Sequence, residues 1–143
     1  MNMENLSALF ENGAYTLVVQ KDGVTICRDF GRGVGPALRL YDAQPEVLRG
    51  ARVYDTIVGK AAAAIYILGG ASGVYAGTMS AAAADFLTAN GVDCACETKT
   101  EKLLNRQGTG LCPFEQAVLE LERPEDCLPV IRATLARLMA GKK

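Results

Sequence analysis

Histidine and tryptophan are both absent from the 143 residues of this sequence, and aromatic residues make up only 6% of it. Without histidine the chain can form neither a Ser-His-Asp nor a Cys-His catalytic triad, and it lacks the commonest zinc ligand. Half of the residues are nevertheless hydrophobic. Because alanine and glycine are abundant, we expect close packing, with small residues where helices meet a sheet.

Neither sign of charge predominates, since 15 basic residues stand against 16 acidic ones. Nucleic-acid-binding modules usually carry a basic excess, so no nucleic-acid partner is predicted. No apolar run reaches the ~18 residues that a membrane helix needs. The first residues, Met1 to Asn5, lack the basic and apolar regions of a signal peptide. We therefore expect a cytoplasmic protein without a membrane segment, and a single domain over residues 1–143.

The five cysteines are too few and too scattered for a disulfide framework. An odd number of cysteines, in a chain without an export signal, predicts reduced thiols. Cys94 and Cys96 are separated by one residue, which fits one face of a strand better than a zinc-binding knuckle. The sequence therefore predicts no metal site and no cofactor.

The hydrophobic pattern predicts alternating helices and strands. Strands over 15–20 and 24–28 are expected to form a hairpin through Lys21-Asp22-Gly23. A glycine-rich loop over 31–35 matches neither common phosphate-binding motif, and we interpret it as a connection. Further strands are predicted over 74–76 and 92–98, and helices over 4–11, 37–41, 56–68, 81–90 and 125–139, with one more helix opening at Cys112-Pro113. This order predicts an α/β fold with helices on both faces of a sheet.

The helix predicted over 56–68 carries one lysine near its start. Every residue after Lys60 in this helix is apolar, so the helix must be buried on several sides. An ammonium group is costly to bury without a partner. Lys60 therefore reaches solvent, pairs with Asp55, or binds an anion beside the helix N-terminus. Ser80 is a natural N-cap for the next alanine-rich helix.

A second polar cluster precedes the helix that opens at Pro113. It combines an amide, a guanidinium, glycines, a hydroxyl, a thiol and a carboxylate within residues 105–115. Cys112 is the candidate nucleophile, because a thiolate is stabilised at a helix N-terminus. The alternative is a loop whose cysteine and glutamate only cap the helix.

These segments together resemble a bacterial family, the domain of unknown function numbered eighteen-ninety-three. The resemblance rests on Asp55…Gly59-Lys60-Ala61-Ala62, on Ser80, and on Asn105-Arg106…Gly108-Thr109…Cys112-Pro113-Phe114-Glu115. It implies a cytidine-deaminase-like, three-layer α/β/α domain with a mixed sheet of about five strands. Zinc deaminases carry their ligands and a catalytic Glu at two helix starts. The matching segments here, Gly59-Lys60-Ala61-Ala62 and Met79-Ser80-Ala81-Ala82, hold neither, so we expect the zinc site to be absent and no zinc-dependent deamination.

The leading hypothesis is a metal-free pocket that binds a small polar or anionic metabolite, with a nucleotide-like ligand suggested by the fold alone. Lys60 and the segment 105–115 should converge on this pocket. The candidate ligand-binding residues are Asp55, Lys60, Ser80, Asn105, Arg106, Thr109 and Glu115. Two alternatives stay open: a metal-independent enzyme that uses Cys112 as nucleophile, and an interaction module that forms a homodimer through its apolar helices.

Overall fold

The sheet is mixed and has five strands in the order β2-β1-β3-β4-β5. The computed structural model describes residues 6–31, 33–105 and 107–141. Its strands are β1 (Leu17–Lys21), β2 (Val24–Asp29), β3 (Arg52–Val58), β4 (Gly73–Ser80) and β5 (Asp93–Thr100). Strand β1 pairs antiparallel with both β2 and β3, whereas β3, β4 and β5 run parallel to one another.

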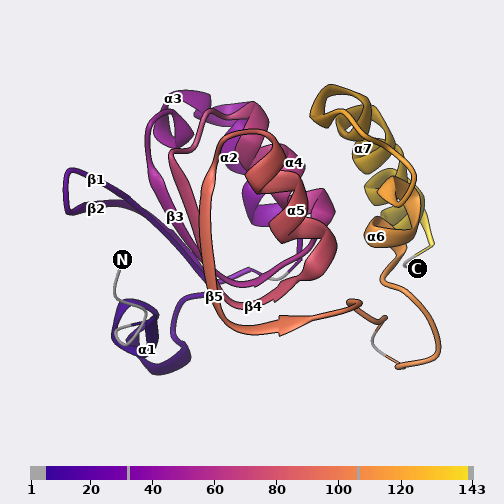
Figure 1. Ribbon diagram of the computed structural model, residues 1–143, viewed down its shortest axis with the longest axis horizontal. Coiled ribbons are helices and arrows are strands. Elements are labelled where there is room, and N and C mark those ends of the chain that lie inside the picture. The colour runs from indigo at the N-terminus through magenta and orange to yellow at the C-terminus, as the bar shows by residue number, and fades with distance from the viewer. Residues whose placement is uncertain (1–5, 32, 106, 142–143) are drawn as a thin grey trace.

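Helices lie on both faces of this sheet, but unequally (Figure 1). They are α1 (Leu6–Leu9), α2 (Gly35–Ala43), α3 (Pro45–Leu48), α4 (Lys60–Leu68), α5 (Ala81–Ala89), α6 (Pro113–Val118) and α7 (Pro124–Ala140), with a 3₁₀ turn, η2, at Glu11–Gly13. Helices α2, α4 and α5 cover one face, and the short α1 lies at the other. Helices α6 and α7 pack together and against α4, on its side away from the sheet. The predicted α/β class and the mixed five-stranded sheet are confirmed, and α6 and α7 add an outer layer.

Helix α4 lies at the centre of the larger hydrophobic core. Its residues from Ala61 to Tyr66 are all buried, none more than 7% exposed. They share a cluster with Val53 of β3 and Val74 of β4 on the sheet side, and with Ile131 of α7 on the other side. A helix that is apolar on all sides is stable only where it is covered in this way. The prediction that the alanine-rich helix is buried is therefore correct.

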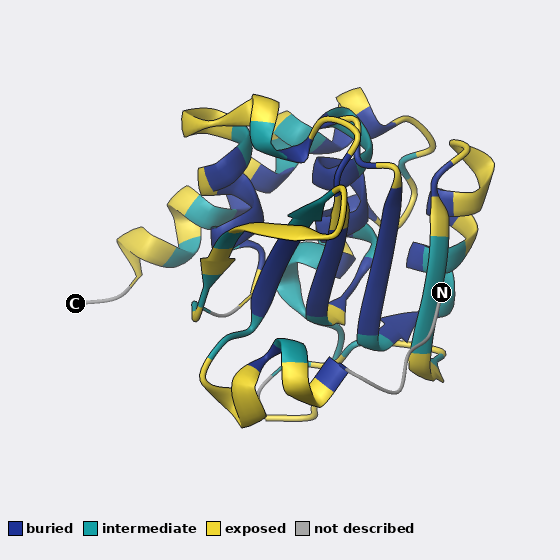
Figure 2. Ribbon diagram, turned by 90° about the vertical axis from the view of Figure 1, so that its left-hand side faces the viewer, coloured by how far each residue is buried: buried dark blue, intermediate teal, exposed yellow. Residues whose placement is uncertain are grey.

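A smaller hydrophobic cluster lies on the opposite face of the sheet. Figure 2 shows that the central strands of the sheet are buried. The rings of Tyr54 and Tyr75 lie side by side there, with centroids 5.4 Å apart. Leu6 of α1 and Phe10 pack against them. This contact fixes the N-terminal turn on the sheet.

The predicted hairpin is confirmed by its turn. Asp22 and Gly23 both have left-handed backbone angles, with φ of 51° and 78°, as the two central residues of a type I′ turn require.

Ser80 caps α5 as predicted, because its Oγ accepts a hydrogen bond of 3.1 Å from the N–H of Ala83.

The predicted start of the buried helix at Thr56 is wrong. Residues from Thr56 to Val58 complete β3, and the helix begins only at Lys60, after an extended Gly59. Pairing with β4 decides this, since Ile57 and Val58 lie opposite Thr78 and Met79. The same pairing extends β4 well beyond the predicted strand over 74–76.

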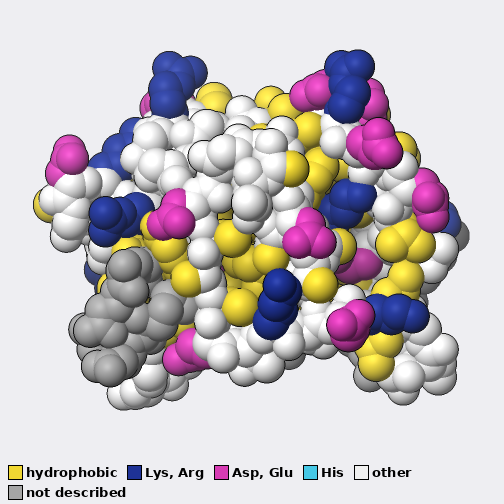
Figure 3. All heavy atoms as spheres, viewed as in Figure 1, with side chains coloured by type: hydrophobic (Ala, Val, Ile, Leu, Met, Phe, Trp, Pro, Cys, Tyr) yellow, Lys and Arg dark blue, Asp and Glu magenta, His cyan; other side chains and the backbone are white. Residues whose placement is uncertain are grey.

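The molecular surface carries charges of both signs. On the face drawn in Figure 3, basic and acidic side chains are interspersed with apolar ones. No helix in the described parts of the chain is long and apolar enough to cross a membrane.

Candidate functional site

A cavity of about 450 Å³ lies where β3 ends and α4 begins. Its described lining comes from four parts of the chain: Thr16 before β1, the glycine-rich loop that follows β2, the junction of β3 with α4, and the residues Leu103, Leu104, Cys112, Phe114 and Glu115. The cavity thus lies at the carboxyl end of a strand of the α/β sheet, where ligand sites are frequent. Most of its walls are apolar or glycine, and Asp55 and Glu115 are the acidic residues in its lining.

Asp55 lines the cavity from β3 and is only 8% exposed. The hydroxyl of Tyr66, on α4, donates a hydrogen bond of 2.6 Å to its Oδ2 atom. Burial raises the pKa of Asp55 to about 7, although hydrogen bonds from Tyr66 and from the N–H groups of Thr56 and Ile57 act to lower it. A carboxyl group with this pKa can both give and accept a proton near neutral pH.

Tyr66 keeps its proton under these conditions. Burial, followed by the charge of Asp55, raises the pKa of its hydroxyl well above 10. Tyr66 therefore acts as a fixed hydrogen-bond donor that orients the Asp55 carboxyl group. It carries a polar atom within an otherwise apolar stretch of α4, and that pattern could have marked it in the sequence.

Glu115 occupies the N-terminus of α4. Its Oε1 accepts a hydrogen bond of 2.7 Å from the N–H of Lys60, and its Oε2 accepts one of 3.1 Å from the N–H of Ala61. The first N–H groups of a helix have no partner within the helix and attract negative charge. The carboxylate of Glu115 therefore takes the position in which α4 would otherwise hold an anion.

Lys60 is directed away from the cavity and is not among its lining residues. Its ammonium group donates hydrogen bonds to the carbonyl of Leu119, at 3.2 Å, and to that of Leu121. It also lies 5.1 Å from the centre of the Phe86 ring, a cation–π distance. Lys60 and Glu115, which were predicted to share one pocket, are in contact. The contact is made by the backbone N–H of Lys60 and the Glu115 carboxylate, and the ammonium group of Lys60 takes no part in it.

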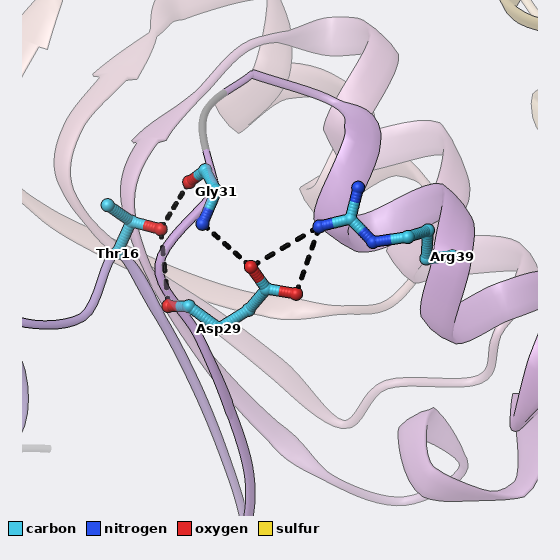
Figure 4. Close-up of polar contacts among 4 residues, drawn as sticks. All are labelled: Thr16, Asp29, Gly31 and Arg39. Carbon is cyan, nitrogen blue, oxygen red and sulfur yellow. Dashed lines mark hydrogen bonds and ion pairs between the residues drawn. The ribbon is translucent and has the colours of Figure 1, made fainter.

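The glycine-rich loop forms one wall of the cavity and is held by the polar contacts in Figure 4. The carboxylate of Asp29 accepts hydrogen bonds from the N–H of Gly31, at 2.7 Å, and from the guanidinium of Arg39, at 3.1 Å. Thr16 donates from its hydroxyl to the carbonyl of Gly31. Burial opposes ionisation of Asp29, yet the Gly31 and Arg39 contacts leave its pKa below the ordinary value. From the sequence we predicted only a connection here. The contacts that make the loop a wall of the cavity join residues from separate elements, so no local pattern reveals them.

Cys112 lines the cavity on the side of α6 and is half-buried. It directly precedes the helix, and its N–H donates to the carbonyl of Leu103 at 2.9 Å. The structure thus brings the predicted nucleophile into one cavity with Asp55 and Glu115.

Ser80, Asn105 and Thr109, which were also predicted to bind the ligand, are not among the lining residues. Ser80 is buried as the cap of α5. Asn105 and Thr109 contact each other across a tight loop, where the Asn105 side chain accepts from the Thr109 N–H at 3.0 Å. Arg106 falls outside the described residues. Among the residues that are described, no three His, Cys, Asp or Glu side chains gather closely enough to hold a metal ion.

Fold and cavity together define an α/β protein with a small acidic pocket at the end of β3. The family described as "TM1506: Domain of unknown function (DUF1893)" matches residues 5–135, so the chain belongs to the DUF1893 family. A crystal structure of a DUF1893 family protein (TM1506) from Thermotoga maritima, at 2.70 Å resolution, is similar to it. The two share 30% identity with a TM-score of 0.78, over 96% of this chain and 92% of the other. No curated protein matches the sequence.

Proposed function

We propose that this protein binds a small polar molecule in the cavity at the end of β3. One observation supports the proposal most: Asp55 and Glu115, which are each only 8% exposed, both line one hollow of about 450 Å³ whose other walls are mostly apolar. Burial raises the pKa of the Asp55 carboxyl group to about 7, and an acid with such a perturbed pKa in a cavity is typical of ligand sites. The volume suits a compound of one or two rings.

The pocket is proposed to work without a metal ion. The chain holds no histidine, and the helix starts at α4 and α5 carry Lys60 and Ala81 where a zinc deaminase would place ligands. A cytidine-deaminase-like fold is part of the proposal. Its support is the mixed five-stranded sheet and the two helices that begin directly after β3 and β4. A nucleotide-like ligand rests on that analogy alone.

A pocket-filling variant tests the proposal. Ala62 lines the cavity from α4, so Ala62→Trp should fill it, whereas Ala133→Trp adds the same side chain at an exposed position of α7. Compounds found by thermal shift with a metabolite library, or by mass spectrometry of the purified protein, should bind the wild type and Ala133→Trp and not Ala62→Trp. Circular dichroism checks that both variants fold. An equal shift in Ala62→Trp would place the ligand elsewhere, and a library without any binder would contradict the proposal.

A metal-independent enzyme with Cys112 as nucleophile is the second candidate. It is favoured because Cys112 lines the same cavity as Asp55, whose pKa suits proton transfer. A covalent adduct on Cys112 after incubation with a bound compound, lost in Cys112→Ser, would support it.

The homodimeric interaction module stays a prediction. That prediction placed the contact on the apolar helices, but α4 is buried within the chain. The surface to test is instead the edge strand β2, where Val24 and Ile26 are 62% and 43% exposed. Sedimentation at several concentrations, repeated with Ile26→Lys, measures whether this edge associates.

A further inference from the structure

The charged groups in the described lining of the cavity are all acidic. Asp55 and Glu115 are each only 8% exposed, and the other lining side chains are apolar or carry a hydroxyl or thiol. A ligand that enters therefore meets negative charge and hydrogen-bond acceptors. A carboxylate or a phosphate on the ligand would be repelled by these two acidic groups.

Among the described residues, the groups at the start of α4 that would attract an anion already have partners. The N–H groups of Lys60 and Ala61, at the start of α4, donate to Glu115. The ammonium group of Lys60 donates to the carbonyls of Leu119 and Leu121 instead of entering the cavity. The helix start that would ordinarily form an anion site is thus filled from within the chain.

We infer that the pocket takes a ligand that presents a cationic or N–H-bearing nitrogen to Asp55, such as an amine or a protonated heterocycle, and that it rejects anions of the same size. The inference rests on the proposed function and names its ligand class. The apolar part of the ligand would lie against the side chains of Val34, Pro36 and Phe114, which line the same cavity.

Asp55, and not Glu115, is the residue that receives the nitrogen. Both oxygens of Glu115 are occupied by backbone N–H groups, and moving them would uncap α4. Asp55 accepts hydrogen bonds from the Tyr66 hydroxyl and from the N–H groups of Thr56 and Ile57, but it caps no helix, so a ligand nitrogen can bind it without uncapping one. The titratable group in contact with Asp55 is Tyr66 on α4, which also feels the charge of Asp29, and Glu115 and Cys112 line the same cavity.

A cation bound beside Asp55 would stabilise its ionised form. Since burial raises the pKa of Asp55 to about 7, most of the protein holds a proton there at pH 6. Binding of a cation at pH 6 should then release a fraction of a proton, and binding should strengthen as the pH rises to 8.

Matched probes of one shape test the charge preference. The probes are benzylamine, benzyl alcohol and benzoate, and a second set that carries the same three groups on a bicyclic ring. Each is titrated by calorimetry at pH 6 and at pH 8. Two buffers that differ in ionisation enthalpy are used, so that proton release on binding can be measured. We expect the amine to bind at least about tenfold more tightly than the carboxylate, the effect of one charge-assisted hydrogen bond. We also expect proton release at pH 6.

Three variants separate the explanations. Asp55→Asn should abolish both the amine preference and the proton release, whereas Asp85→Asn, at an exposed position of α5, should leave both unchanged. If the carboxylate probes bind more tightly than the amines, and this preference is lost in Arg106→Gln, the inferred ligand class is wrong. The proposal that the cavity binds a small polar molecule would still hold. Absence of binding by any probe of any charge would overturn both.

Discussion

The carboxylate of Glu115 lies in the space that a side chain at Gly59 would need. A Cβ atom at position 59 would come within 2.5 Å of both the Cδ and the Oε1 atom of Glu115. The carboxylate cannot move aside freely, because it is held by the N–H groups of Lys60 and Ala61. The absence of a side chain at 59 thus allows α6 to reach the start of α4.

Replacing Gly59 by alanine should therefore lower the free energy of unfolding by about 1–3 kcal/mol, as overpacking does in a core. Glu115→Ala should cost about 0.5–2 kcal/mol through loss of the cap. The double variant should lose less than the sum of the two, since the clash disappears with the carboxylate. Urea denaturation measures all three. Gly110→Ala is the control, because its nearest neighbouring atom would be 4.0 Å away. If the double variant loses as much stability as the two single variants together, the predicted clash between position 59 and the Glu115 carboxylate does not exist.

Asp55 should make the protein less stable as the pH rises from about 4 to about 7. Its folded pKa is about 7, against an ordinary value of 3.8. Between these values the folded chain holds a proton that the unfolded chain has released, and stability falls with pH wherever the folded state binds more protons. The loss is at most about 4 kcal/mol and is complete above the folded pKa.

Asp55→Asn should remove this dependence, because an amide keeps the hydrogen bond from Tyr66 without ionising. The variant should be more stable than the wild type at pH 8 and similar to it at pH 4. Urea denaturation at pH 4 to 8 gives the comparison, and the difference between the two proteins cancels the contribution of other acids such as Asp29. A variant that is less stable at pH 8 would show that the ionised carboxylate is stabilised in the folded protein.

The fold was predictable where local pattern and tertiary structure agree. The hairpin through Asp22-Gly23 and the cap at Ser80 are local features, and the structure has both. The end of β3 was not predictable, because Thr56 to Val58 precede an alanine run and pair with a distant strand. Non-local pairing overrides local helix preference at such a boundary.

Some of the residues named from the sequence line the cavity, whereas Lys60, Ser80, Asn105 and Thr109 do not. Asp55, Cys112 and Glu115 stand out as polar groups beside helix starts, and the cavity includes all three. Lys60 also stands out, since it needs a partner. That partner is a pair of backbone carbonyls, which any sequence supplies, so the sequence carries no sign of them. Glu115 meets Lys60 across 55 positions of the chain, a distance that no local pattern spans.

Lys60→Met should therefore act on stability and spare ligand binding. The variant leaves the carbonyls of Leu119 and Leu121 without their donor, at a cost of about 1–3 kcal/mol. Lys102→Met, at an exposed position, should cost nothing measurable. Urea denaturation and titration with a pocket ligand check the two effects separately. Loss of binding by a variant of unchanged stability would instead place the ammonium group at the ligand.

Cys112 should be alkylated by iodoacetamide severalfold faster than Cys27, Cys94, Cys96 and Cys127. It lines the open cavity, whereas burial raises the pKa of the Cys27 and Cys127 thiols and so lowers their share of reactive thiolate. Cys94 and Cys96 pack against the core from β5. Peptide mass spectrometry across a pH series gives the rates, and a ligand in the cavity should slow Cys112 alone. If Cys112 reacts no faster than the other four, the nucleophile hypothesis is wrong. A fast Cys112 whose replacement by serine leaves ligand binding intact would favour an enzyme over a passive binding protein, because the thiol would then be exposed to the ligand without being needed to hold it.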